Sequence, residues 1–313
     1  MIRGIAIAFT SALLIGCGTT HGAAGASDVT SVMTADAPPE SALHRAWGSD
    51  SNDVWAVGNA GKIVHFDGAH WAGSATPTNQ TLRGVWGASA SDVWAVGHRG
   101  TIVHFDGATW RLMDKVVDDD LHAVVGLAAD DVWAVGVHGA AVHWDGERWN
   151  RMDSGANAGL FGLYAASTNN VWAVGLRGTV VHFDGSEWET VTVPTYQHLY
   201  SVWGTSSKDV WAVGLGGTRL HFDGVSWKPM QDGADLDLVD VWGSSPNDVW
   251  AIGWNDEALR WNGKRWARAE TESGTVLRSV WGASHNDAWA VGLQGAIVHW
   301  NGASWIKADV ASR

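Results

Sequence analysis

A row of histidines is the first feature of this 313-residue chain that could do chemistry, because imidazole binds metals and transfers protons near neutral pH. Each histidine occupies the same place in a separate copy of a 39-residue repeat, so the side chains should be spread around the molecule and not gathered on one ion. An aspartate also recurs, as in Asp53 ahead of His65, and a buried polar group needs a partner. We therefore expect His–Asp hydrogen bonds within the copies and no metal site. The histidines are His65, His104, His143, His182, His221 and His299, and Arg260 takes their place in the sixth copy.

Constellations that would indicate an enzyme are weak. No pair of carboxylates is set apart as acid and base, and no Ser-His-Asp signature is present. The stretch Gly58–Lys62 is too short for a phosphate loop and has no Ser or Thr after its lysine. We expect a non-catalytic protein without a cofactor.

The repeat that carries these residues is regular from end to end. A Val-Trp-Ala-Val-Gly block or a close variant occurs seven times without insertion or deletion, and its tryptophans are Trp55, Trp94, Trp133, Trp172, Trp211, Trp250 and Trp289. A period of this length indicates one supersecondary unit copied along the chain. Of the 23 tryptophans, 19 occupy three repeat slots, so we expect them to pack between the units and not to bind a ligand.

Each copy contains four short runs rich in Val, Ile, Trp and Thr, bounded by turn residues. In the first copy these are about Leu43–Gly48, Val54–Gly58, Lys62–Phe66 and His70–Gly73. An Asp-Gly or Asn-Gly pair follows the third run in every copy, as at Asp67-Gly68, and predicts a type I′ hairpin turn. Four antiparallel strands in seven copies predict an all-β, seven-bladed β-propeller over residues 41–313.

The copies differ mainly in two loops, and these are where a site for one ligand is expected. In a propeller, the turn between strands two and three and the junction between blades emerge on one face, around the central channel. Their aromatic, amide and charged side chains suit a glycan or a protein loop better than a small apolar ligand. The first loop offers His98, Arg99, His138, Arg177, Trp254, Asn255, Asp256, Glu257 and Gln294. The second offers Asp118, Asp119, Asp120, Tyr196, Gln197 and His198.

The sixth copy departs most from the others. It has a tryptophan, Trp254, where no other copy has one, followed by Asp256 and Glu257. One interpretation is an aromatic anchor beside a polar pocket; the other is drift in a redundant repeat, with Arg260 pairing to Glu257 or Asp256 on the surface. Two carboxylates without a loop pattern do not specify calcium.

The N-terminus carries a targeting signal. Arg3 precedes an apolar run too short to span a bilayer, which is typical of a signal peptide over residues 1–16. The run ends in Leu14-Ile15-Gly16-Cys17, which resembles the lipobox of bacterial lipoproteins and implies lipidation of Cys17, the single cysteine. Residues 17–40 are rich in Gly, Ala, Ser, Thr and Pro and are interpreted as a tether. The resemblance implies an outer-membrane lipoprotein, facing the periplasm or the cell surface, because Gly18 and not Asp follows the cysteine.

The net charge of −13 argues against nucleic acid as a partner and against docking to anionic lipid head groups. The membrane contact expected from the sequence is therefore the N-terminal lipid. We expect a monomer.

The order Asp-Val-Trp-Ala-Val-Gly, Ile-Val-His-Phe-Asp-Gly and a second tryptophan, as at Trp110, resembles the Trp/Gly-rich repeat propellers of secreted bacterial lipoproteins. It is more distantly similar to Asp-box propellers, photosystem II assembly-factor propellers and tectonin-type lectins. The Asp-box has tryptophan five residues after its aspartate, whereas Trp71 follows Asp67 by four. The resemblance implies an envelope scaffold that binds another protein, with a glycan-binding lectin as the alternative. A sialidase-like hydrolase is weaker, since Tyr164 lies in a framework slot and only Tyr196 and Tyr200 remain as nucleophiles.

Overall fold

The structure is a computed structural model, and it describes residues 42–230, 236–254, 256–308 and 310. All of these belong to one compact unit spanning Ala35–Arg313. The signal peptide, Cys17 and the tether predicted from the sequence lie outside the described residues. Within the described part, no helix is long and apolar enough to cross a membrane.

The described residues form seven four-stranded antiparallel sheets, each built from one repeat in the order of the chain. In the first blade, β1 (Leu43–Asp50) pairs with β2 (Asp53–Gly58), which pairs with β3 (Ile63–Phe66), which pairs with β4 (Trp71–Ser74). The predicted all-β, seven-bladed propeller is therefore confirmed. The strand bounds expected from the sequence hold to within a residue or two, because alternating apolar residues and flanking turn residues mark both ends.

The other blades repeat this arrangement. The first strands are β5 (Leu82–Ser89), β9 (Leu121–Ala128), β13 (Leu160–Ser167), β17 (Leu199–Ser206), β21 (Leu238–Ser245) and β25 (Leu277–Ser284). The second strands are β6 (Asp92–Gly97), β10 (Asp131–Gly136), β14 (Asn170–Gly175), β18 (Asp209–Gly214), β22 (Asp248–Gly253) and β26 (Asp287–Gly292). The third strands are β7 (Ile102–Phe105), β11 (Ala140–Trp144), β15 (Val180–Phe183), β19 (Arg219–Phe222), β23 (Glu257–Trp261) and β27 (Ile297–Trp300). The fourth strands are β8 (Trp110–Leu112), β12 (Trp149–Asp153), β16 (Trp188–Thr190), β20 (Trp227–Pro229), β24 (Trp266–Glu270) and β28 (Trp305–Ala308).

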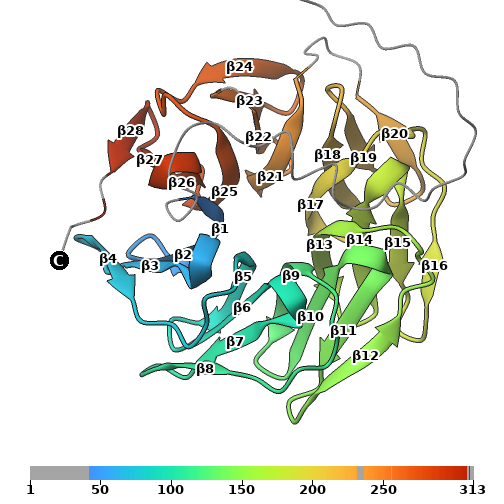
Figure 1. Cartoon of the computed structure of the whole chain (residues 1–313). Coiled ribbons are helices and arrows are strands. Elements are labelled where there is room, and N and C mark those ends of the chain that lie inside the picture. The colour runs from blue at the N-terminus through green and yellow to red at the C-terminus, as the bar shows by residue number, and fades with distance from the viewer. Residues whose placement is uncertain (1–41, 231–235, 255, 309, 311–313) are drawn as a thin grey trace, which may run out of the picture. The chain divides into compact units, whose positions relative to one another are not determined.

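The blades close into a ring around their first strands. Each first strand contacts the first strand of the next blade, and the cycle ends with β25 against β1. Figure 1 shows these strands innermost and the fourth strands outermost. No strand is exchanged between blades in the described part. Val310, which follows the seventh blade, forms a parallel bridge with Trp71 of the first blade. This bridge adds a contact between the two blades that close the ring.

Tryptophan pairs join every blade to its neighbour. Trp55 stacks on His65 of its own blade and meets Trp110 of the next blade edge to face, with ring centroids 5.4 Å apart. Such T-shaped pairs have a favourable quadrupole geometry besides their apolar area. The structural role predicted for these two tryptophan slots is confirmed. The same contact recurs in Trp94–Trp149, Trp133–Trp188, Trp172–Trp227, Trp211–Trp266 and Trp250–Trp305, and Trp289–Trp71 closes the ring.

A second set of aromatic rings packs on glycines of the neighbouring first strand. A Cβ built on Gly126 would lie 2.4 Å from the Trp86 ring, so only glycine leaves room for it. The one aliphatic residue in this aromatic slot is Val125, and its neighbour in the next blade is Ala165 and not glycine. Ring size and receiving residue therefore match blade by blade. The other pairs are Trp47 on Gly87, Tyr164 on Gly204, Trp203 on Gly243, Trp242 on Gly282 and Trp281 on Gly48.

The predicted type I′ hairpin turn is wrong. Gly68 has a φ of 89°, but Asp67 is not among the residues with positive φ. The loop has four residues, from Asp67 to His70, and the Asp67 carboxylate accepts hydrogen bonds from the backbone N–H groups of Ala69 and His70. Asp67 is required for its side chain, which forms an Asx turn, and not for a left-handed backbone. These backbone donors also lower the pKa of Asp67.

Candidate functional site

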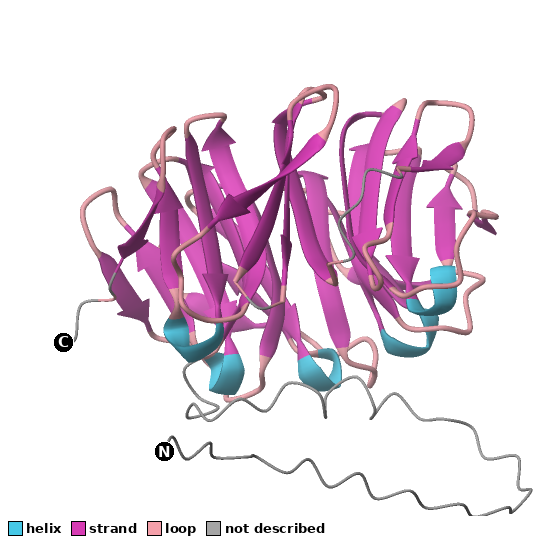
Figure 2. Ribbon diagram, turned by 90° about the horizontal axis from the view of Figure 1, so that it is seen from above, coloured by secondary structure: helices cyan, strands magenta, loops and turns pink. Residues whose placement is uncertain are grey.

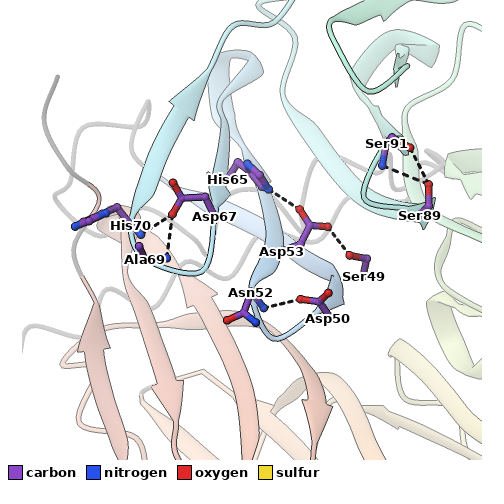
Figure 3. A network of polar contacts seen from close by, with 10 residues as sticks. All are labelled: Ser49, Asp50, Asn52, Asp53, His65, Asp67, Ala69, His70, Ser89 and Ser91. Carbon is purple, nitrogen blue, oxygen red and sulfur yellow. Dashed lines mark hydrogen bonds and ion pairs between the residues drawn. The ribbon is translucent and has the colours of Figure 1, made fainter.

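The repeated histidines bond the aspartate of their own blade, as expected. His65 Nε2 donates to Asp53 Oδ1 at 2.5 Å, and the other Asp53 oxygen accepts from the Ser49 hydroxyl (Figure 3). Five histidines form this bond; the other four pairs are His104–Asp92, His143–Asp131, His221–Asp209 and His299–Asp287. The fourth blade is the exception. It has Asn170, whose oxygen accepts from Trp172 Nε1, and His182 Nε2 has no partner among the described residues.

In the described ranges, no group of three or more His, Cys, Asp or Glu side chains is placed to hold a metal ion. Arg260 substitutes for the missing histidine of the sixth blade, because its Nε donates to Asp248 at 2.6 Å. Its guanidinium also lies over the rings of Trp250 and Trp300, 5.0 and 5.2 Å from their centroids. The expected pairing of Arg260 with Glu257 or Asp256 is therefore wrong.

A surface pocket next to Arg260 lies between blades 6 and 7, lined by Trp242, Asp248 and His285 among others. It opens at the ends of β21 and β25, on the face of the propeller away from the turns between second and third strands. Asp248, the backbone oxygen of His285 and the two tryptophan rings already engage the guanidinium. We interpret this pocket as a consequence of the arginine substitution in the framework.

The two variable loops meet on one face. The second and third strands are joined by short 3-10 turns, η4 (Asn59–Gly61), η5 (His98–Gly100), η6 (Val137–Gly139), η7 (Leu176–Gly178) and η8 (Leu293–Gly295). Figure 2 shows these turns together on one side of the propeller. Blade junctions bond to them: Asp120 accepts from the Arg99 N–H at 2.7 Å, and His198 Nδ1 accepts from the Arg177 N–H at 3.0 Å. We call this the turn face.

Four of the predicted rim residues share an uncommon backbone. Arg99, His138, Arg177 and Gln294 have φ between 54° and 58°, and their side chains are exposed. The left-handed region is costly for such residues, and residues with this strain cluster at functional positions. Tyr196, in a blade junction, is 92% exposed. These five side chains are therefore exposed to solvent at the turns and blade junctions of the turn face.

The sixth blade replaces a turn glycine with Asp256, which has a φ of 61°. Its carboxylate accepts from Thr271, Ser273 and the Gly274 N–H, so it organises its own loop and is not presented to a ligand. Glu257 pairs with Arg268 at 2.9 Å. Asn255 lies outside the described residues. Neither carboxylate belongs to a group that could hold calcium in the described part.

The channel mouth is lined by a slot that sequence analysis missed: the residue after the repeated leucine of each first strand. In every blade this residue lies at a register shift, as His44 does between Leu43, paired with Gly58, and Arg45, paired with Val57. A bulge of this kind re-aims the extra side chain. The slot differs in almost every blade, and we call its members the mouth residues: His44, Arg83, His122, Phe161, Tyr200, Val239 and Arg278.

One side of the mouth is cationic. Arg278 Nη1 contacts His44 Nδ1 at 2.5 Å, and His44 Nε2 contacts the Asn59 side-chain oxygen at 2.6 Å. Arg83 Nε donates to His98 Nε2 at 3.2 Å. Burial together with Arg83 and Arg278 lowers the pKa of His44, and burial with Arg83 lowers that of His98. Both imidazoles are neutral at pH 7 and accept from the two arginines.

The other side of the mouth is aromatic. The His122 ring stacks on Phe161 with centroids 5.0 Å apart, and Phe161 contacts Tyr200 at 5.6 Å. Tyr200 contacts Trp254 of the sixth blade at 5.9 Å and His198 at 6.4 Å. This continuous aromatic wall runs over four blades. The predicted rim residues Trp254, His198 and His98 therefore reach the mouth itself, through Tyr200 and Arg83.

Below the mouth, an ion pair ties distant blades together. Arg45, one residue after His44, extends past blade 7 to Asp240 of blade 6, with Nη1 and Oδ1 2.6 Å apart. Asp240 is 2% exposed and also accepts from the Ser201 hydroxyl and the Val280 N–H. These partners satisfy a carboxylate that would be costly to bury alone. The mouth thus has a polar floor joining blades 5, 6, 7 and 1.

No protein-family description and no curated protein matches this chain. Among solved structures it is similar to YCF48 bound to D1 peptide, at 17% identity and a TM-score of 0.70 over 84% of this chain and 93% of that one. It is also similar to YCF48 from Cyanidioschyzon merolae, at 17% identity and a TM-score of 0.68 over 84% and 97%. The WD40 β-propeller domain of Doa1 aligns at 12% identity with a TM-score of 0.72, over 84% and 93%. At these identities the likeness shows the propeller fold. The fold and the mouth residues together define a seven-bladed propeller whose blades differ from one another on one face of the ring.

Proposed function

We propose that this chain is a lipid-anchored, non-catalytic scaffold of the cell envelope that binds a segment of another envelope protein at the mouth of its channel. The observation that carries the proposal is the mouth itself. Among seven near-identical blades, the slot aimed at the axis holds histidine, arginine, phenylalanine, tyrosine and valine. The leucine before this slot, by contrast, is the same in all seven blades.

The chemistry of the mouth suits a peptide. Cationic and aromatic groups lie side by side around one opening, and exposed arginine and tyrosine side chains such as Arg177 and Tyr196 surround it. Arginine and aromatic residues are the types enriched at the energetically dominant positions of protein interfaces. One of the similar structures is a propeller with a peptide bound, so the proposed mode of binding is compatible with this fold.

The envelope location rests on the N-terminal sequence. In the proposed mature protein, Cys17 carries the acyl chains, and each buried methylene contributes about 0.8 kcal/mol to membrane binding. The stretch from residue 18 to about residue 40 then separates the propeller from the outer membrane. Whether the propeller faces the periplasm or the cell surface follows from the partner, and we propose a monomer in either case.

The proposal is tested by cross-linking and pull-down from detergent-solubilised envelopes. The wild type is compared with a mouth variant, Tyr200→Ala combined with Trp254→Ala, and with a control variant, Val225→Ala, changed on the opposite face where Val225 is 87% exposed. We expect one envelope protein with the wild type and the control, and its loss from the mouth variant. Recovery of polysaccharide alone would replace the scaffold with the lectin alternative, for which the Tyr200–Trp254 ring pair offers a stacking surface.

A further inference from the structure

The pocket between blades 6 and 7 lies where two residues of neighbouring blades depart from the repeat. Arg260 takes the place of the histidine that the other six blades have, and His285 occupies a position where the other blades have Ser, Ala, Thr or Pro. Both residues line the pocket, together with Trp242, Asp248 and Asn262 among others, and its volume is about 900 Å³. We call it the Arg260 pocket. The arginine accounts for its presence, and the groups around the arginine determine its chemistry.

The Arg260 pocket holds no uncompensated carboxylate. Asp248 is the one acidic residue among the described residues that line it. Its Oδ1 accepts from Arg260 Nε at 2.6 Å, and its Oδ2 accepts from the Ser244 hydroxyl at 2.6 Å. Asn262 stands where the first five blades have aspartate, so a second negative charge is absent from the wall. Because a guanidinium keeps its charge in proteins, the ion pair leaves the pocket without net negative charge.

Several hydrogen-bond donors of the Arg260 pocket remain available to a ligand. Arg260 Nη2 donates to the backbone oxygen of His285 at 3.3 Å, whereas Nη1 has no hydrogen-bond partner among the described residues. The side chains of His285 and Asn247 are exposed, and they form no hydrogen bond with another described residue. The Asn262 side-chain oxygen accepts from two backbone N–H groups, which leaves its amide nitrogen as a donor. A ligand that accepts hydrogen bonds therefore meets donors from both blades.

The hairpin turn next to the Arg260 pocket is basic. It runs from Asn262, which lines the pocket, to Arg265, and Lys264 lies between them. Lys264 and Arg265 are exposed, and neither has an ion-pair partner in the described part of the chain. No other blade has two Lys or Arg residues in this turn, and the whole chain has a net charge of −13. Coulombic attraction therefore favours an anion at this place on an otherwise acidic protein.

An anion that also carries hydroxyl groups matches these features. The oxygens of a carboxylate or a phosphate accept charge-assisted hydrogen bonds from a guanidinium. Amide, imidazole and serine side chains both donate and accept hydrogen bonds, as sugar hydroxyls do. Trp242 is 9% exposed, and Arg260 covers the rings of Trp250 and Trp300, so the pocket offers little surface to an apolar ligand.

We propose that the Arg260 pocket binds an acidic saccharide, whose carboxylate or phosphate contacts Arg260 and whose hydroxyl groups contact His285 and the two asparagines. The site lies on the face opposite the mouth, so it adds a second ligand to the proposed function and does not depend on the envelope partner. The anion comes from a uronic acid or from a phosphorylated sugar, and separate probes distinguish the two sources.

The test measures the binding of four small molecules to the full chain in detergent micelles by isothermal titration calorimetry. The probes are glucuronic acid, glucose 6-phosphate, glucose and inorganic phosphate. We expect a dissociation constant of about 1 mM or lower for at least one acidic sugar, as for two charge-assisted hydrogen bonds. Glucose and inorganic phosphate each lack half of the proposed ligand and should bind about tenfold or more weakly. The acidic sugar that binds more tightly identifies the anion.

The repeat supplies variants that change the Arg260 pocket and keep the fold. Arg260→His restores the histidine of the other six blades and should weaken binding of the acidic sugar about tenfold or more. His285→Ser restores the serine present in blades 1 and 5 and should weaken it about 3- to 10-fold. Lys228→Gln, which changes a 61% exposed cation of blade 5, is the control and should leave the dissociation constant unchanged.

Equal affinities for glucose and the acidic sugars, or no binding of either acidic sugar up to about 10 mM, would overturn the site. An unchanged affinity in Arg260→His would do the same, and inorganic phosphate binding as tightly as glucose 6-phosphate would contradict the saccharide. The variant with Tyr200→Ala and Trp254→Ala should bind the acidic sugar as the wild type does, and a loss there would place the sugar at the mouth instead. Capture of the envelope partner should be unchanged in Arg260→His, so failure of this site and failure of the scaffold are distinguishable.

Discussion

Each aromatic ring of a first strand packs on a glycine of the next blade, and the smaller Val125 packs on Ala165. This match in size predicts that substitutions at the two positions of a pair have coupled effects on stability. In Gly126→Ala the new methyl carbon would lie 2.4 and 2.5 Å from Cη2 and Cζ3 of Trp86, well inside contact distance. The ring cannot withdraw freely because it is packed between the first strands of two blades. Overpacking of this kind costs about 1–3 kcal/mol, and we expect Gly126→Ala to lower the free energy of unfolding by that amount.

The decisive experiment is a double-mutant cycle. Trp86→Val with Gly126→Ala recreates the Val125–Ala165 pairing of the next blade junction, where an alanine is accommodated. The double variant should then be more stable than the sum of the single effects predicts, by about 1–3 kcal/mol. The reverse exchange, Val125→Trp with Ala165→Gly, should show coupling of the same sign.

Urea unfolding followed by tryptophan fluorescence measures each free energy, and an unchanged m value shows that the same transition is compared. The matched control is Gly73→Ala, because a Cβ at Gly73 meets no atom within 4 Å. It should change stability by no more than about 0.5 kcal/mol. Additive single effects in both cycles, or a Gly126→Ala effect equal to the control, would refute the steric reasoning.

Three further predictions concern the turns and the axis. Gly100→Ala should lower stability by at least about 2 kcal/mol, since Gly100 has a φ of 67° and its Cβ would lie 1.9 Å from the Val117 oxygen; a urea midpoint equal to the wild type's would contradict this. His122→Phe keeps the stacked ring but removes a proton site whose pKa is lowered to about 3 in the folded state. Because the unfolded histidine binds the proton from about pH 6.5 downward and the folded one does not, stability falls as pH falls through that window. The variant's unfolding free energy should fall less steeply between pH 6 and 4, by about 1.4 kcal/mol per pH unit, and parallel curves would count against the assignment. Arg45→Met should cost about 3–5 kcal/mol at pH 7 by leaving the Asp240 carboxylate without its cation, and adding Asp240→Asn should recover much of it; no recovery in thermal unfolding would mean the pair is not the cause.

The fold could be predicted from the sequence because the buried, aromatic and turn residues all recur with the same 39-residue period. Leucine, tryptophan and turn residues recur at one spacing, so strand order, blade number and the tryptophan contacts follow from the period alone. The His–Asp bonds were predictable for the same reason, since His65 and Asp53 recur as a pair. The pairing predicted for Arg260 was wrong because proximity in the chain favours Asp256 and Glu257, whereas the register of β22 with β23 places Arg260 beside Asp248.

The mouth could not be found by strand alternation. His44 and its equivalents follow a fully buried leucine within a strand, so the sequence pattern indicates a structural role for them. A bulge breaks the period of two at this residue, and only the register makes that visible. The available signal was variability directly after an invariant leucine, from Arg83 to Phe161 to Val239. Variation in the loops indicated the rim of the turn face and not the mouth residues.

The central claim is that the partner binds on the turn face, and site-specific photo-cross-linking in intact cells tests it most directly. A photoreactive phenylalanine analogue would replace Tyr196, 92% exposed at the rim, or Val225, 87% exposed on the opposite face. The two positions are equally accessible and differ in the face they report. We predict a discrete protein adduct from position 196 and none from position 225. An adduct from position 225 alone, or equal adducts from both, would contradict the account.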